Sequence, residues 1–241
     1  MSEVITTPPP PPPPPPPQPP KVGFDFVRPF AFVFEDARWL NKVLIGGVFQ
    51  ILSFILVGIP FVLGYLAVLV RNVVADQPQP LPEWDDLGDK FAEGLRLVGI
   101  GIVYIIPMFA LIGVIIVPAV MMGVIAQHHG NSDFDPGGLI GCFGCLAGPL
   151  GLLYALWVPA AMLNAMVEQR FGAAFDFHRI WAFISNNIGN YLLAVVVMFV
   201  ARFAASFGVI LFCVGVVFTI FWAMLVTFYA FAQAWRLATV K

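Results

Sequence analysis

Charged residues are scarce in this chain. Asp, Glu, Lys and Arg together make up 11% of its 241 residues, whereas a soluble domain carries about 25%. Hydrophobic residues make up 60% of the chain, and the mean hydropathy is +0.89. Such a chain cannot cover its surface with polar side chains. The composition therefore excludes a soluble globular domain and predicts an integral membrane protein.

Other shortages exclude further classes. Three cysteines are too few for a disulfide framework. The formal net charge of −2 offers no overall basic surface for nucleic acid, and no nucleic-acid-binding motif is present. The first twenty residues lack the basic and apolar regions of a signal peptide, so we expect no cleaved leader. The central parts of the apolar stretches contain no Asp, Glu, His or Lys and no GxSxG motif. The sequence therefore predicts no enzyme activity, no cofactor and no metal.

Proline is concentrated near the N-terminus, where twelve of the 22 prolines lie within residues 8–20. A run of prolines adopts the extended polyproline II helix, at about 3.1 Å per residue. Residues 1–22 are therefore predicted to be a disordered, proline-rich cytoplasmic tail, and residues 23–241 a polytopic membrane domain. The rod is either a spacer or a docking segment for a proline-binding module. The near absence of basic flanking residues favours the spacer.

Long apolar stretches follow the tail. One membrane span needs about 20 apolar residues, so the last stretch, 188–235, must contain two helices. The first stretch, 40–70, contains a potential break at Gly58-Ile59-Pro60 and is either one bent helix or a hairpin. With the hairpin, the sequence predicts helices over 40–57, 60–76, 92–126, 139–168, 188–212 and 215–237.

The distribution of basic residues favours the hairpin. Eleven of the twelve Lys and Arg residues lie at or beyond the ends of the spans. Six spans place all eleven on one side of the membrane, whereas a single span over 40–70 would separate Arg71 from residues before it. The bias of basic residues toward the cytoplasm therefore predicts six spans with both termini cytoplasmic. The eleven residues are Lys21, Arg28, Arg38, Lys42, Arg71, Lys90, Arg96, Arg170, Arg179, Arg236 and Lys241.

An internal repeat precedes two of the apolar hairpins. The segment Phe24–Phe32 reads FDFVRPFAF, and Phe175–Phe183 reads FDFHRIWAF. Both are amphipathic at helical spacing, and a third such stripe runs from Trp84 to Leu95. The predicted fold is therefore all-α, with three hairpins that are each preceded by an interfacial amphipathic helix. Aromatic side chains favour the membrane interface, and we expect them there at Trp39, Trp84, Trp181, Tyr191 and Trp235.

Arg202 is the only charged residue in the central part of a predicted span. An arginine at the membrane centre usually faces the bundle interior or water. Arg202 is therefore expected either to contact an anion or a lipid inside the membrane, or to extend to the outer surface. A path through the protein would need a water-accessible cavity that reaches this residue.

Two other groups carry weaker signals. Cys142-Phe143-Gly144-Cys145 has the spacing of a redox motif, but it lies in a predicted membrane helix, where cysteine is an ordinary packing residue. His128, His129, Asp133 and Asp135 could bind zinc, although adjacent histidines in a loop are more often solvated. The loop over 127–138 contains no Lys or Arg, as an external loop should.

A short acidic segment stands before the third predicted helix. It consists of Leu81, Pro82, Glu83, Trp84, Asp85 and Asp86. Acids in the first turn of a helix are favoured by its dipole. These carboxylates either start the helix and pair with Lys90 and Arg96, or bind a cation or a basic partner.

The same segment carries the strongest part of a resemblance to a known family. Further matching positions are Asp36, Trp39, Lys42, Ile45-Gly46-Gly47, Gly64-Tyr65, Gly94, Gly189, Tyr191, Gly215 and Phe218-Thr219. With these residues, Asp36–Gln233 resembles domain-of-unknown-function family 4013. The family tends to have proline soon after the last threonine, where this chain has Ile220-Phe221-Trp222. The resemblance implies a multi-pass protein of a prokaryotic cytoplasmic membrane and brings no established activity.

Two functions are compatible with these observations. The first is a non-enzymatic multi-pass membrane protein that acts through membrane lipids or other membrane proteins, without nucleic acid. The alternative is a small transporter or channel with a polar path near Arg202, because transporters often combine internal repeats with broken helices. The scarcity of polar residues in the spans favours the first.

Overall fold

The computed structural model describes residues 23–128, 136–210 and 214–239, and all regular elements in these ranges are helical. The predicted tail, most of the external loop and Cys213 lie outside the described residues, whereas Val214 and Gly215 of the expected turn already belong to the last helix. The α-helices are α1 (Arg28–Ala31), α2 (Trp39–Leu52), α3 (Gly58–Val74), α4 (Leu87–His128), α5 (Pro136–Glu168), α6 (Phe177–Asn186), α7 (Ile188–Ser206) and α8 (Val214–Thr239). Short 3-10 helices are η1 (Phe32–Glu35), η2 (Ser53–Ile55), η3 (Phe171–Phe175) and η4 (Phe207–Ile210).

The first apolar stretch is broken into two helices. Leu56, at the end of η2, takes a left-handed φ of 66°, which ends the helical run before α3 begins at Gly58. A Cβ at Gly58 would overlap the carbonyl oxygen of Phe49, so the chain turns tightly against the last turn of α2. The structure therefore shows two helices in this stretch, and the break lies at Leu56-Val57, directly before the predicted Gly58-Ile59-Pro60.

Helix lengths support some of the predicted spans. By length and composition alone, four helical segments of the described chain are long and apolar enough to cross a membrane. They are Leu87–Ala110, Gly151–Glu168, Ile188–Val209 and Gly215–Thr239. The helices α2 and α3 are apolar but shorter, so the helix lengths do not establish six spans.

The three predicted interfacial helices have different outcomes. The helix predicted around Phe175–Phe183 is present as α6. At its start the Asp176 side chain accepts a hydrogen bond from the Arg179 amide, and the helix buries Ile180 and Phe183. The first is only a four-residue turn, α1, followed by η1. The prediction of a separate helix around Trp84–Leu95 is wrong, because α4 runs without interruption from Leu87 to His128. Nothing in the sequence between the amphipathic stripe and the apolar run breaks the helix.

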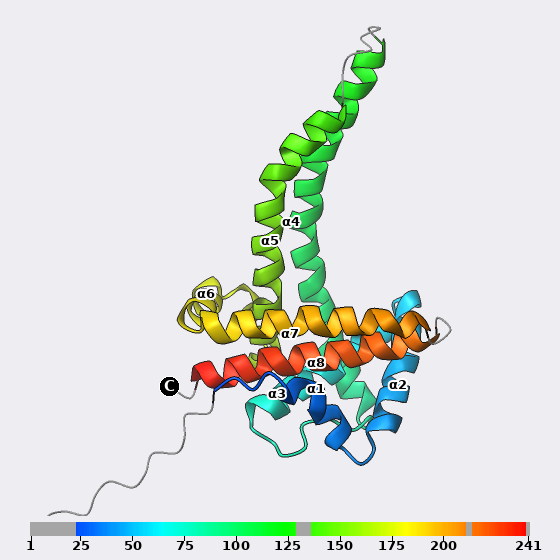
Figure 1. The fold of residues 1–241 in the computed structure, drawn as a ribbon, viewed down its shortest axis with the longest axis vertical. Helices are drawn as coiled ribbons and strands as arrows, with labels where there is room; N and C mark the ends of the chain where they lie inside the picture. Colours follow the sequence, from blue (N-terminus) through cyan, green and yellow to red (C-terminus); the bar gives the residue numbers. More distant parts are fainter. Residues whose placement is uncertain (1–22, 129–135, 211–213, 240–241) are drawn as a thin grey trace, which may run out of the picture.

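Two helix pairs dominate the architecture (Figure 1). The pair α4 and α5 projects from the rest of the molecule, and the pair α7 and α8 runs crosswise to it. The outer part of the first pair leans to one side. Prolines lie inside both of its helices, at 107 and 118 in α4 and at 149 and 159 in α5. A proline inside a helix removes a backbone hydrogen bond and bends the axis, so each helix contains a source for the bend.

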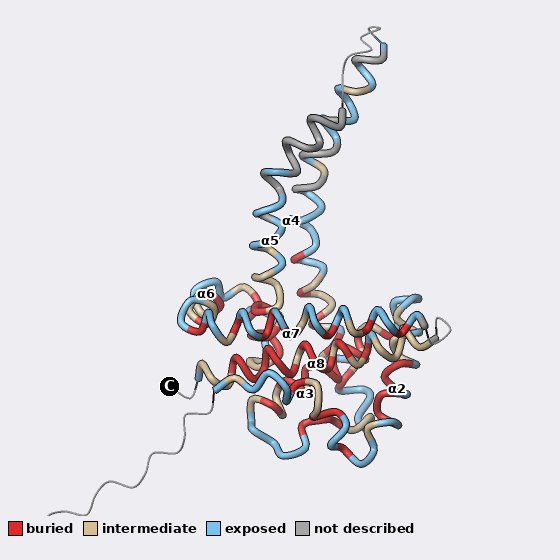
Figure 2. The backbone as a smooth tube through the Cα atoms, in the orientation of Figure 1, coloured by how far each residue is buried: buried red, intermediate tan, exposed pale blue. Residues whose placement is uncertain are grey.

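The core lies away from the projecting pair. Buried positions concentrate where α3 and α8 meet the base of α4 and α5, whereas the described positions of the projecting part are mostly exposed (Figure 2). Trp84 is half-buried, and Tyr191 and Trp235 are almost fully buried in this core. These three rings therefore pack within the protein, and their position relative to a membrane interface stays a prediction. Trp181, at 63% exposure, is the accessible ring of the predicted set.

Candidate functional site

The acidic segment 81–86 forms part of the connection between α3 and α4, and its backbone is held by two helices. The ammonium group of Lys42 in α2 donates a hydrogen bond to the carbonyl oxygen of Leu81 at 3.0 Å. The hydroxyl of Tyr65 in α3 donates to the carbonyl oxygen of Pro82 at 2.8 Å. Leu81 and Pro82 are buried. This part of the connection forms no helix or strand, so its carbonyl groups have no regular backbone partner and can accept from these side chains.

Trp84 anchors the segment through its ring. The indole Nε1 donates to the carbonyl oxygen of Lys42 at 2.9 Å. The ring stacks on Tyr65 with a centroid distance of 4.2 Å and on Phe49 at 4.9 Å. Aromatic pairs at these distances stabilise by about 0.5–1.5 kcal/mol beyond the area they bury. The segment is therefore packed against α2 and α3 on one side and continues into α4 on the other.

A buried ion pair lies beside this aromatic stack. The Lys42 ammonium is 2.6 Å from the Asp36 carboxylate and 2.8 Å from that of Glu83. The side chains of Lys42 and Asp36 are only 5% and 8% exposed, whereas Glu83 is 41% exposed and also pairs with Arg38. Burial acts to raise the pKa of Asp36, but the hydrogen bonds from Lys42 and the Arg38 amide outweigh it and hold this pKa below its ordinary value.

This lowered pKa predicts a loss of stability in acid. A carboxyl whose pKa is depressed on folding contributes stability above its unfolded pKa, which is lost as the pH falls through the folded value. We therefore expect the melting temperature of the protein in detergent to fall below about pH 4. Asp36→Asn should be less stable at neutral pH and should show a shallower fall in acid. The same acid-induced fall in both proteins would contradict the assignment.

The other acids of the segment behave partly as predicted. Asp85 pairs with Lys90 at 2.9 Å, and this hydrogen bond lowers the pKa of Asp85. The α4 helix begins at Leu87, directly after the segment. The predicted pairing with Arg96 is wrong, because Arg96 pairs instead with Glu93, one turn away in α4. The segment thus precedes a helix start, and two of its acids, Glu83 and Asp85, bind basic residues of this chain.

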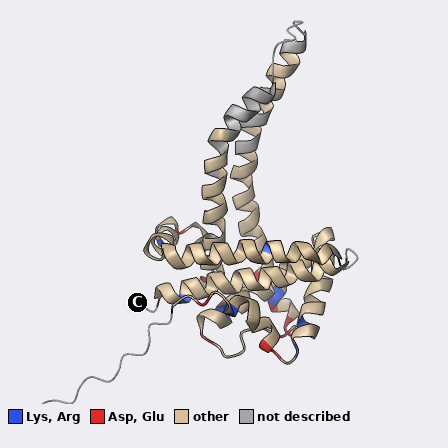
Figure 3. Cartoon of the chain, viewed as in Figure 1, with Lys and Arg blue, Asp and Glu red and all other residues tan. Residues whose placement is uncertain are grey.

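A second charged cluster joins the ends of other helices. Arg71, near the end of α3, pairs with Glu93 in α4 through both of its terminal nitrogens. Arg96 donates to the carbonyl oxygen of Gln169, directly after α5, at 2.6 Å. Arg236 in α8 pairs with Asp76, just beyond α3. Figure 3 shows charged residues in the body of the molecule and none on the described parts of α4 and α5 that project beyond it.

The glycines of the resemblance allow helices to approach closely. A Cβ at Gly64 of α3 would overlap the carbonyl oxygen of Lys90, and a Cβ at Gly94 of α4 would overlap that of Pro60. Backbone therefore meets backbone where α3 crosses α4. In the same region, Gly46 and Gly47 of α2 accommodate aromatic rings of α8. Most of the residues that carry the resemblance thus meet where α2, α3, α4 and α8 pack together, which we call the junction; Gly189 and Tyr191 lie apart from it on α7.

Arg202 lies outside the junction. It is exposed on α7, whereas its neighbours Ala201 and Ala205 are buried. Among the residues that the structure describes, none forms a hydrogen bond or ion pair with its side chain. The contact with an anion or a lipid stays a prediction.

The other candidate residues are only partly described. Cys145 is exposed, and the side chain of Cys142 lies outside the described part of the structure. His129, Asp133 and Asp135 also lie outside the described residues. Among the side chains that are described, no group of three or more His, Cys, Asp or Glu residues could hold a metal ion.

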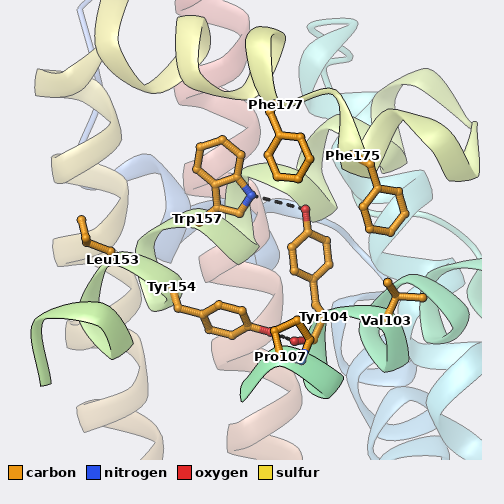
Figure 4. Close-up of a pocket in the computed structure, with 8 residues that line it drawn as sticks. All are labelled: Val103, Tyr104, Pro107, Leu153, Tyr154, Trp157, Phe175 and Phe177. Carbon is orange, nitrogen blue, oxygen red and sulfur yellow. Dashed lines mark hydrogen bonds between the residues drawn. The ribbon is translucent and has the colours of Figure 1, made fainter. Parts of the chain in front are cut away.

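An aromatic pocket was not predicted from the sequence. It has a volume of about 620 Å³ and lies between α4, α5 and the start of α6 (Figure 4). Its lining includes Tyr104, Tyr154, Trp157, Phe175 and Phe177. The spacing of Tyr154 and Trp157 places both rings on one face of α5. This spacing is the one sequence feature that could have indicated an aromatic cluster. The partners from α4 and η3 could not be read from that spacing.

The fold and the family comparison together classify the chain. The chain is an all-helical protein in its described parts, with apolar helices of membrane-spanning length and a polar junction at their ends. These are the features of a membrane protein. The chain belongs to the family described as "Protein of unknown function (DUF4013)", whose model matches residues 48–214. The predicted family is thus confirmed. Asp36, Trp39, Lys42 and Ile45-Gly46-Gly47 precede the matched range, and Gly215 and Phe218-Thr219 follow it. Comparison with curated proteins and with solved structures found no match.

Proposed function

We propose that this chain is a non-enzymatic, multi-pass protein of a prokaryotic cytoplasmic membrane that acts through contacts with lipids and other membrane proteins. The observation that carries the proposal is the extent of exposed apolar surface on its long helices. In α4, Ile106, Phe109 and Val114 are 61%, 64% and 70% exposed. In α7, Phe199 and Phe203 are 62% and 68% exposed. Exposure of contiguous apolar surface of this size to water is unfavourable, whereas lipid chains solvate it.

The polar groups of the junction support a structural role. Lys42, Asp36 and Glu83 bind one another, and Tyr65 and Trp84 are engaged with backbone carbonyl groups. A catalytic group must be free to bind a substrate or to transfer a proton. These side chains are instead occupied in fixing the connection between α3 and α4 to α2.

The proposal includes six spans with both termini in the cytoplasm. Ion pairs and hydrogen bonds gather the end of α3, the start of α4 and the ends of α5 and α8 into one region. Basic residues at that region, among them Arg71, Arg96 and Arg236, match the positive-inside bias. This arrangement favours a cytoplasmic position for the connection from Ala75 to Asp86.

Cysteine labelling tests the topology. The three native cysteines are first replaced by serine, and a single cysteine is then introduced by Ser132→Cys, Gln77→Cys or Gln169→Cys. An impermeant maleimide added to intact cells should modify the Ser132 variant and spare the other two. Permeabilised cells are the control, because all three variants should then react. Labelling of the Gln77 variant in intact cells would refute six spans.

A further inference from the structure

We propose that the aromatic pocket between α4, α5 and α6 holds one hydrocarbon chain of a membrane lipid. This inference rests on the proposed function, because it requires that the exposed surface of α4 and α5 lies among lipid chains. It goes further by assigning a defined lipid-binding site to one place on that surface.

The chemistry of the lining selects an apolar occupant. The Tyr104 hydroxyl donates to the carbonyl oxygen of Ala174 and accepts a hydrogen bond from the Trp157 indole at 3.3 Å. The Tyr154 hydroxyl donates to the carbonyl oxygen of Tyr104. Figure 4 shows the bonds that Trp157 and Tyr154 make to Tyr104. A polar ligand would lose its bonds to water and find these groups already engaged, which is costly in an apolar site. A hydrocarbon chain carries no such cost.

The size of the pocket matches one chain. Its volume is about 620 Å³. A methylene group takes roughly the volume of one liquid water, about 30 Å³, so the space accommodates on the order of twenty such groups. This is about the number of carbon atoms in a single lipid chain. Small-molecule sites of this volume are commonly lined by hydrophobic and aromatic side chains, as this one is.

The rim connects the pocket with the surface that faces lipid. Leu153 and Phe177 at the rim are 64% and 60% exposed, and Val103 is 41% exposed. Next to them, Ile106 of α4 and Leu152 of α5 are 61% exposed. Apolar surface is therefore continuous from the pocket to the outside of the helix pair. A lipid chain can enter sideways from the bilayer without crossing a polar barrier.

Fluorescence quenching by brominated lipid tests the inference. The protein is reconstituted into phosphatidylcholine vesicles with either ordinary or brominated chains. Comparison with Trp157→Phe isolates the emission of Trp157, which lines the pocket. We expect brominated chains to quench this emission. Val103→Phe or Leu153→Phe, each of which fills the pocket from one wall, should reduce the quenching about twofold or more, because bromine atoms lose access to the site. Each variant is compared with the same variant lacking Trp157.

Val114→Phe is the matched control. Val114 also lies on the exposed surface of α4, three turns beyond Val103 and away from the pocket, so this change should leave the quenching unaltered. Equal quenching in wild type and in both folded filling variants would overturn the inference. Quenching of the total emission without quenching of Trp157 would overturn it too, while leaving the proposed function intact. Failure of the protein to float with the vesicles would instead overturn the proposed function itself.

Discussion

Replacing Lys42 with methionine is expected to destabilise the protein by about 3–5 kcal/mol, because the change leaves a buried carboxylate without its partner. The Asp36 side chain is 8% exposed, and its bond to the Lys42 ammonium is 2.6 Å long. Methionine keeps the length and packing of the lysine stem but cannot donate to Asp36, Glu83 or the Leu81 carbonyl. The free energy of unfolding, measured in mixed micelles by denaturant titration, gives the loss directly.

Two companion variants separate the causes. Arg38→Met removes an exposed pair with Glu83, in which Arg38 is 68% exposed, and should cost less than about 1 kcal/mol. The double change Lys42→Met with Asp36→Leu removes both buried charges and should recover most of the stability. A Lys42 variant as stable as the Arg38 variant would show that the buried pair does not hold the junction together.

Replacing Gly94 with alanine is expected to cost about 1–3 kcal/mol through overpacking. The added Cβ would overlap the carbonyl oxygen of Pro60, which is backbone and cannot rotate away. The crossing of α3 over α4 must therefore open, which disturbs the nearby contact of Gly64 with Lys90. The loss is measurable as a lower melting temperature of the purified protein in detergent.

Gly101→Ala provides the control for the same helix. A Cβ at Gly101 would meet no atom within 4 Å. Alanine has a higher helix propensity than glycine by about 1 kcal/mol, so this variant should be as stable as the wild type or slightly more stable. Equal effects of the two substitutions would mean that α3 and α4 do not approach as closely as the structure shows.

Local signals in the sequence predicted the helices well. Gly58-Ile59-Pro60 marked the break between α2 and α3, and the six apolar helices lie close to their predicted ranges. The start of α4 at Leu87 follows the acidic segment, as the helix dipole suggested. The largest shift is at α7, which ends at Ser206 and continues as the 3-10 helix η4. In η4, a Cβ at Gly208 would overlap the side chain of Thr219 in α8.

Contacts between distant residues could not be predicted in this way. The partners of Trp84 were not predicted, because its ring stacks on Tyr65 and Phe49 and neither residue is close to it in the sequence. Arg96 pairs within its own helix because Glu93 lies one turn before it, which the spacing did allow. The aromatic pocket depends on η3 folding back against α4 and α5, and no periodicity reveals that fold. Sequence patterns thus located the helices, whereas their partners depend on the tertiary packing.

The crosswise arrangement of the two helix pairs has a consequence for how the protein occupies a bilayer (Figure 1). A bilayer has a single normal, and membrane helices tilt from it by up to about 40°. Two crosswise pairs can therefore both span only if they tilt steeply in opposite directions. The lengths agree with such tilts, since the uncharged part of α4, residues 97–127, measures about 47 Å against a hydrocarbon core of about 30 Å. With the spans proposed here, the two helix pairs would be inclined to each other in the bilayer. A thicker membrane would reduce the tilt of both pairs from the bilayer normal.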